Sequence, residues 1–221
     1  WLAQAGYDTP PETHIGVPAA YALGMFRRPA NADTAWRALL VVPAPGRAGL
    51  LLHPLENGRW AVTIALPPGV SAPADFDALL ALARALPTPA VYEALCAAEA
   101  LHPPRAWAHP GSRAVDYHRL ARWPQGLAVT GDAVCALDPA YGHSLTAVAL
   151  AALACDAVLG EQRRAYPDGA LDGLGQRLQK AQAAALKAPV RAAAAFEAWR
   201  AGEAGAVTGR CADALLAAAA S

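Results

Sequence analysis

The sequence lacks paired cysteines, metal-ligand clusters and any excess of charge of one sign. Four cysteines are scattered without a CxxC pair, namely Cys96, Cys135, Cys155 and Cys211. Neither they nor the six histidines have the short spacing that metal ligation needs, so no metal site is expected. We expect reduced thiols in a cytoplasmic protein. Eighteen basic and eighteen acidic side chains cancel, which argues against nucleic acid or anionic lipid as partners.

The sequence also lacks a long apolar run and a leader. The longest apolar stretch, residues 145–159, contains Asp156 and is too short and too rich in alanine to span a bilayer. The chain opens at Trp1 with no initiator Met, basic region or apolar signal core, so we expect further residues upstream. What remains is a globular composition, 55% hydrophobic and 16% charged over 221 residues, sufficient for a buried core.

The first third of the sequence predicts an antiparallel sheet. Residues 12–67 are rich in β-formers, with apolar runs of strand length at 39–42, 49–54 and 60–66. Asn57-Gly58 lies between the last two runs, and both residue types tolerate positive φ, which favours a hairpin there. Alternation along the third run places Trp60, Val62, Ile64 and Leu66 on one face.

The rest of the chain alternates helical spacing with short strands. Helices are expected at 71–86, with its start near Ser71, at 90–100, at 142–159 and from 176, where Pro189 should kink or break the last one. Strands are expected at 105–115 and 126–130, a linker at 164–175, and a short terminal helix after Gly202.

The segment that carries chemistry is RLARWPQGLAVTGDAVCALDPAYGHSLTAVALAAL, residues 119–153. The expected strand ends at Gly131, and Asp132 then places a carboxylate at the edge of a sheet, where ligands of open α/β sheets gather. Pro139 and Gly142 shape a loop before a helix, whose first N–H groups stabilise negative charge. A carboxylate beside a positive helix end suits a cofactor with a ribityl chain and a ring that becomes anionic. An ordinary turn with a capping Asp is the alternative.

This segment resembles the GD…P…G motif of the para-hydroxybenzoate-hydroxylase-like FAD monooxygenases. WLAQAGYDTPPET, HPLENGRWAVTIAL, ALARALPTPAVYEAL and YHRLARWPQGLAVTGDA are similar to one bacterial branch, so the resemblance covers roughly residues 1–160. It implies that Gly131 and Asp132 lie at the ribityl chain. It also implies that the following loop lies against the isoalloxazine ring, at the positions Pro139, Tyr141, Gly142, His143 and Ser144.

Two features depart from the family pattern. Ser144 stands where relatives usually carry glycine, so its Cβ is expected to crowd the ring. The GxGxxG loop that binds the ADP pyrophosphate occurs nowhere in the chain, and the nearest match, Gly173-Leu-Gly175, follows no strand. We therefore expect FAD to bind the complete protein and to bind this chain alone weakly or not at all. No catalytic side chain is assigned, because the cofactor carries the chemistry.

The resulting prediction is an α+β chain. A mixed, mainly antiparallel substrate-domain sheet with helices is followed by the C-terminal part of an FAD-binding α/β domain. Three parts are expected: a substrate-binding sheet region with two helices (1–115), a flavin-contacting strand, loop and helix (116–160) and a C-terminal helical region (161–221). Arg27 and Arg28 either reach a ligand or lie at the sheet rim. Arg113, Arg119 and Arg122 are expected to pair with the missing N-terminal part.

By resemblance, the intact enzyme would use NAD(P)H and O2 to oxygenate a small apolar or aromatic substrate through a flavin C4a-hydroperoxide. The residues leave two alternatives open: a truncated or degenerate relative that acts as a non-catalytic binding module, and one chain of a split flavoenzyme. A missing N-terminal nucleotide-binding segment, in cis or in trans, is the expected partner. Self-association is also expected, because an unpaired strand edge invites a second copy.

Overall fold

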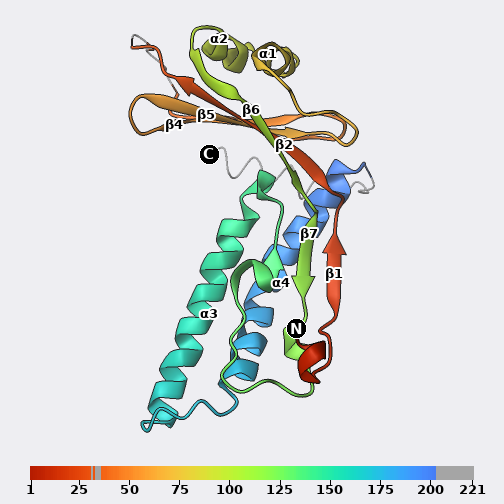
Figure 1. Cartoon of the computed structure of the whole chain (residues 1–221), viewed down its shortest axis with the longest axis vertical. Coiled ribbons are helices and arrows are strands. Elements are labelled where there is room, and N and C mark those ends of the chain that lie inside the picture. Colours follow the sequence, from red (N-terminus) through yellow and green to blue (C-terminus); the bar gives the residue numbers. More distant parts are fainter. Residues whose placement is uncertain (31, 33–35, 203–221) are drawn as a thin grey trace. The chain divides into compact units, whose positions relative to one another are not determined.

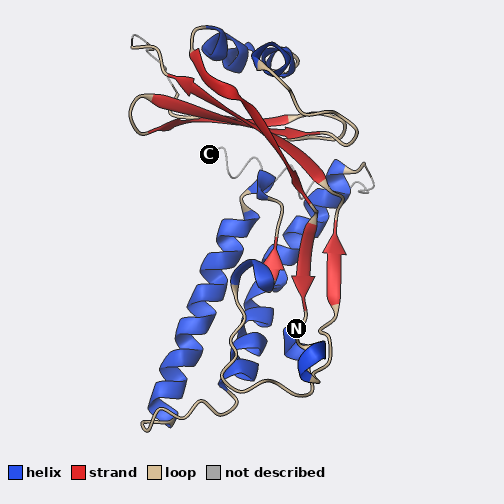
Figure 2. Cartoon of the chain, viewed as in Figure 1, coloured by secondary structure: helices blue, strands red, loops and turns tan. Residues whose placement is uncertain are grey.

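The computed structural model describes residues 1–30, 32 and 36–202. It divides into two compact units, whose helices and strands are drawn in Figure 2. The sheet unit consists of Pro18–Pro110 with residues 198–202, and the helical unit consists of Trp1–Val17 and Gly111–Glu197. Every strand pairing in the described chain is antiparallel, so the predicted α+β class with mainly antiparallel sheets is confirmed.

The sheet unit is built on five strands in the order β3-β4-β5-β2-β6. Their bounds are β2 Ala19–Arg27, β3 Leu39–Val41, β4 Gly49–Leu55, β5 Arg59–Leu66 and β6 Glu99–His109. The predicted hairpin joins β4 to β5, with Leu55 opposite Arg59 and with Asn57 and Gly58 at φ of 60° and 63°. The three predicted strands of this region are therefore confirmed within a residue or so at each end.

One face of this sheet is covered by two helices, α1 Phe76–Arg84 and α2 Pro89–Cys96 (Figure 1). As predicted, Trp60, Val62, Ile64 and Leu66 share one face, and each is at most 2% exposed. The core that they form with the helices includes Phe26, Leu50, Leu52, Leu79, Ala83, Val91 and Leu95. Burial of this apolar surface provides the main driving force for folding the unit.

The helix and strand boundaries after β5 differ from the expected ones. Helix α1 begins at Phe76 rather than near Ser71, because the Asp75 side chain accepts a hydrogen bond from the Ala78 N–H at 2.8 Å and caps the helix. Helix α2 ends at Cys96, and the chain is already in β6 by Glu99. The single strand expected at 105–115 is two strands, because Pro110 and Gly111, at φ 96°, separate β6 from β7.

The helical unit combines a three-stranded sheet with two long helices. Strands β1 Glu12–Ile15, β7 Ser112–Val115 and β8 Cys135–Ala136 pair in the order β1-β7-β8. Helices α3 His143–Ala165 and α4 Leu174–Arg200 follow, and short 3₁₀ turns lie at Ala3–Ala5, Tyr117–Arg119, Gly131–Ala133 and Pro139–Tyr141 (Figure 1). Its core is a small cluster that includes Val134, Leu137, Ala147, Ala151 and Leu186.

The strand expected at residues 126–130 is wrong for this structure. These residues join no ladder within the described chain, and side chains bind their carbonyls instead. The Val129 carbonyl accepts hydrogen bonds from Gln179 Nε2 at 2.7 Å and Gln182 Nε2 at 2.9 Å. The Leu127 carbonyl accepts from Trp123 Nε1 at 2.9 Å. A strand needs a neighbour to pair with, and the described part of the chain offers none here.

The two long helices also differ from expectation. Helix α3 continues six residues past the predicted end, to Ala165, and α4 passes through Pro189 without a break. By length and composition α3 is the one described helix that could cross a membrane, although its apolar run by itself is shorter. Such a match is weak evidence, because core helices of soluble proteins meet the same criterion. The terminal helix expected after Gly202 lies outside the described residues.

Candidate functional site

The predicted cofactor loop, residues 131–142, includes the short strand β8 and ends at the start of α3. Two of its residues adopt the left-handed conformation that favours glycine, Gly131 at φ 65° and Gly142 at φ 71°. A Cβ at either position would meet nothing within 4 Å among the described atoms, so the backbone here faces open space. Between them, Asp132 lies in a 3₁₀ turn with an exposed side chain. The loop therefore presents a carboxylate and bare backbone to a ligand.

No side chain caps the first N–H groups of α3 in the described chain. Gly142 is its N-cap residue and has no side chain to cap it, and no acidic residue lies in the first turn. The first N–H groups of a helix have no partner within the helix and carry partial positive charge. Ser144 does not cap them either, since its hydroxyl donates to the Leu137 carbonyl at 3.4 Å. The geometry of this helix end suits a negatively charged group.

Asp138 is a positioning residue that reasoning from the sequence missed. It is buried at 3% exposure, and its Oδ1 accepts a hydrogen bond from the Ala140 N–H at 2.9 Å. Its own N–H donates to Ser112 Oγ at 2.7 Å, which ties the loop to β7. The available signal was the Asp-Pro pair, because Asp at a cap followed by Pro at the first helical position is a common turn start.

Two titratable side chains near the loop are held in their neutral forms. Burial raises the pKa of the Cys135 thiol to about 11, and the Asp132 carboxylate adds to the increase. A thiol with such a pKa is not a nucleophile at neutral pH. Burial lowers the pKa of His143, whose ring lies 5.1 Å from that of Phe196. Neither group is placed as a charged catalyst.

The predicted residues are adjacent in the structure largely because they are adjacent in sequence. Gly131 and Asp132 precede β8, and Pro139, Tyr141, Gly142, His143 and Ser144 follow it. Pro139 and Gly142 are exposed, while His143 and Ser144 are half-buried. Their role in binding a cofactor stays a prediction.

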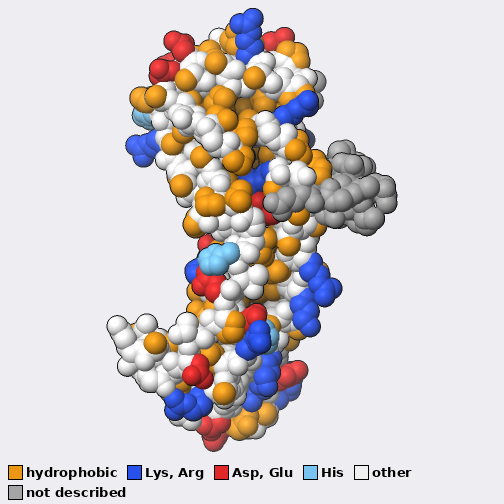
Figure 3. Space-filling model, turned by 90° about the vertical axis from the view of Figure 1, so that its right-hand side faces the viewer, with side chains coloured by type: hydrophobic (Ala, Val, Ile, Leu, Met, Phe, Trp, Pro, Cys, Tyr) orange, Lys and Arg blue, Asp and Glu red, His pale blue; other side chains and the backbone are white. Residues whose placement is uncertain are grey.

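The arginine cluster has partners inside the chain. Arg113 Nη1 lies 3.5 Å from Glu12 Oε1, and Arg119 Nη1 lies 3.6 Å from Asp116 Oδ2. The Arg122 guanidinium donates a hydrogen bond to the Gly6 carbonyl. That these cations pair with the missing N-terminal part stays a prediction. On the face drawn in Figure 3, basic and acidic side chains are interspersed rather than gathered by sign. No group of three or more metal-ligating side chains occurs in the part of the chain that the structure describes.

The fold is similar to part of the fold seen in solved structures of flavin-dependent monooxygenases. PqsL of Pseudomonas aeruginosa, described as a probable FAD-dependent monooxygenase, matches 90% of this chain with a TM-score of 0.63 at 18% identity. The p-nitrophenol 4-monooxygenase PnpA of Pseudomonas putida matches 92% with a TM-score of 0.52 at 16% identity. The chain covers 52% and 49% of these two structures. At such identities the likeness shows the fold alone.

One curated protein is similar to this chain in sequence. Protein Rv3254 of Mycobacterium tuberculosis is 31% identical over 152 residues, which is 69% of this chain and 32% of that protein. No protein-family model matches the chain. The chain thus spans about a third of its curated relative and about half of the solved structures. The activity of a whole flavoenzyme is accordingly a proposal for this chain.

Proposed function

We propose that this chain is the substrate-binding and C-terminal part of an FAD-dependent monooxygenase that uses NAD(P)H and O2 to oxygenate a small apolar or aromatic molecule. The observation that carries the proposal is the loop at residues 131–142. There the exposed Asp132 carboxylate, two positive-φ glycines and an uncapped helix start occur together. The shared fold of PqsL and PnpA supports it.

The residues present fit a flavin. Asp132 would accept hydrogen bonds from ribityl hydroxyls, and the first N–H groups of α3 would stabilise negative charge on the ring. Gly142 has no Cβ to obstruct a flat ligand, and Pro139 is exposed beside it. When bound, FAD supplies the redox and oxygen chemistry. The chain contributes orientation through this loop, a polarised helix end, and a sheet face for the substrate, from which water would be excluded.

Helix α3 supports a further partner in the complete protein. Its exposed side chains include Leu145 at 80%, Leu153 at 67%, Leu159 at 49% and Val148 at 47%. Apolar side chains gathered on one element mark a surface that another protein segment covers. The proposed occupant of this α3 surface is the nucleotide-binding half of the flavoenzyme, in cis or in trans, and a second copy of the chain is the competing occupant.

Removing the Asp132 carboxylate tests the proposal. In the flavin-binding form of the protein, Asp132→Ala should weaken FAD about 10- to 150-fold, because a hydrogen bond to a charged group contributes about 1.5–3 kcal/mol. Flavin fluorescence titration gives the affinity, and a thermal melt of the flavin-free protein gives the stability. Asp132 is exposed, so the melting temperature should stay unchanged.

Asp138→Ala is the matched control, since it removes a carboxylate six residues away that is buried and caps the loop. This variant should lower the melting temperature of the flavin-free protein. If Asp132→Ala binds FAD as tightly as the parent, or behaves like Asp138→Ala, Asp132 is an ordinary turn residue and the assignment of the loop is wrong.

A further inference from the structure

A cavity of about 550 Å³ lies in the sheet unit, beside the end of α1. This volume falls within the range of small-molecule sites, about 300–1,000 Å³. Three segments form its walls: the turn between β3 and β4, the turn after β5, and the end of α1 with the residues that follow it. The lining includes Arg47, Pro67, Val70, Leu82 and Leu86. None of its residues belongs to the candidate cofactor loop.

The two turns that form walls of the cavity are fixed by their own sequences. Each contains Pro followed by Gly at positive φ, with 67° at Gly46 and 79° at Gly69. The Arg47 N–H donates to the Ala44 carbonyl at 2.9 Å, and a bond of the same kind closes the second turn at 3.2 Å. This combination is typical of type II turns. The walls are therefore formed before a ligand arrives, so little affinity is lost in ordering them.

Arg47 is the charged residue among the described residues that line the cavity. Its side chain is exposed and makes no hydrogen bond or ion pair with any residue that the structure describes. Arg84, in the last turn of α1, has a different contact, because its guanidinium lies 5.8 Å from the centre of the Tyr92 ring on α2. No carboxylate belongs to the described lining. An anion that enters the cavity therefore meets one available cation.

The α1 wall of the cavity is aliphatic. Leu82 and Leu86 are four residues apart and half-buried, and both pack against the core between the sheet and its helices. Val70, on the turn after β5, keeps 39% of its surface exposed. The last turn of a helix carries partial negative charge, which disfavours a carboxylate beside it. The charged end of a ligand therefore belongs at Arg47, and its hydrocarbon part belongs along the two leucines.

We propose that this cavity binds an unbranched aliphatic carboxylate of medium length, with its carboxylate at the Arg47 guanidinium and its chain along Leu82 and Leu86. A guanidinium forms paired, parallel hydrogen bonds with a carboxylate, which a neutral amide cannot match. The described lining has no aromatic ring on which a flat molecule would stack. The inference concerns a further ligand of the sheet unit and does not depend on the proposed function.

Two probes with the same chain test the proposal on the protein without flavin: octanoate, which is an anion, and octanamide, which is neutral. NMR titration of the isotope-labelled chain gives both the affinity and the location, and the amide signals of Gly46, Ala48 and Leu86 should shift. Octanoate should bind about two- to fivefold more tightly than octanamide, the range of an exposed ion pair. Butanoate should bind at least about tenfold more weakly than octanoate, because it buries fewer methylene groups.

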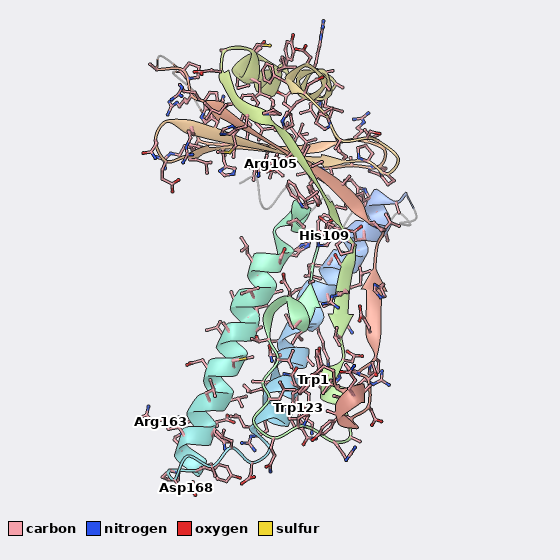
Figure 4. All side chains as sticks on the ribbon, in the orientation of Figure 1. Trp1, Arg105, His109, Trp123, Arg163 and Asp168 are labelled. Carbon is pink, nitrogen blue, oxygen red and sulfur yellow. The ribbon has the colours of Figure 1, made fainter. Side chains whose placement is uncertain are left out.

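Three variants assign the effect to the cavity. Arg47→Met should abolish the preference for octanoate over octanamide. Arg105→Met is the matched control and should retain it, because Arg105 (labelled in Figure 4) is an exposed arginine of β6 that does not line the cavity. Ala85→Phe places a ring at an exposed position of the lining and should weaken both probes alike. A far-ultraviolet circular dichroism melt of each variant separates local effects from unfolding.

The inference is overturned if octanoate does not bind, if octanoate and octanamide bind equally, or if Arg47→Met keeps the preference. Shifts confined to residues outside the cavity, or loss of the preference in Arg105→Met, would overturn it as well. Since no flavin is present, the outcome is independent of the Asp132 experiment. A flavin-binding protein whose cavity does not bind octanoate would overturn this inference and leave the proposed function standing.

Discussion

The two units of the molecule bury their apolar side chains to very different extents. In the sheet unit, large residues on strands and helices meet in one core, where Leu52, Val62, Leu79 and Leu95 are all at 0% exposure. In the helical unit, the core is mostly alanine and loop residues, and Leu145, Leu153 and Leu159 of α3 are exposed. The sheet unit therefore buries its large apolar side chains, while the helical unit leaves several of them exposed to solvent.

The predicted strands form in the sheet unit, and the strand predicted at residues 126–130 does not form. Strands of the sheet unit find their neighbours inside the chain, whereas residues 126–130 find only side-chain donors from Trp123, Gln179 and Gln182. Side chains that bind backbone carbonyls satisfy them without making a sheet. If residues 126–130 paired with a strand of another segment, the same sequence would form a strand there.

The largest expected effect comes from replacing one leucine of each unit by alanine and comparing the loss of stability. Leu79→Ala removes a fully buried side chain of α1 and should reduce the free energy of unfolding by about 2–5 kcal/mol. Leu145→Ala changes a side chain of α3 that is 80% exposed and should stay within about 0.5 kcal/mol. Urea unfolding followed by circular dichroism measures both. Comparable losses would contradict the contrast between the units. A large loss at Leu145 only in a longer, flavin-binding protein would sharpen it.

Raising the pH should lower the free energy of unfolding of the helical unit, because the Cys135 thiol ionises. Its thiol has a pKa of about 11 in the folded protein, above the ordinary 9.0, so the unfolded chain loses the proton first. The stabilisation is complete below pH 9 and is lost as the pH rises toward 11, by about 3 kcal/mol at most. Urea midpoints at pH 8 and pH 11 measure it. Cys135→Ala should remove this pH dependence and Cys96→Ala should not; equal slopes in all three proteins would count against it.

A smaller effect distinguishes the two aspartates of the candidate loop in the flavin-free chain. Asp138→Ala should lower the free energy of unfolding by about 1–2 kcal/mol, because it removes a capping acceptor from a buried position. Asp132→Ala should change it by less than about 0.5 kcal/mol, since that side chain is exposed. Thermal melts of both variants decide the matter. A larger loss from Asp132→Ala would mean that this carboxylate supports the fold rather than a ligand.

Much of the sheet unit could be predicted because its signals are local. Alternation in Trp60, Val62, Ile64 and Leu66 and the Asn57-Gly58 turn specify strand, face and hairpin without reference to the rest of the chain. Capping was harder, since both Ser71 and Asp75 are acceptable caps, and in the structure Asp75 caps α1. Pro189 was expected to interrupt a helix that in fact continues through it.

The motif indicated where the candidate site lies, but it did not indicate the hydrogen bonds that hold the loop in place. The sequence indicated Gly131, Asp132 and Gly142, because glycine at positive φ and an acidic residue after a glycine are visible in the residues themselves. The Asp138 bond to Ser112 joins residues far apart in the chain, so only the fold reveals it.

The sequence by itself determined the α+β class, the antiparallel hairpin and the position of the glycine-bounded loop, because each depends on periodicity and turn chemistry over a few residues. The tertiary structure decided which carbonyls pair with strands and which with side chains, and which aspartate is buried. Those properties depend on contacts between distant segments, and such contacts form only when the chain has a neighbour to pack against.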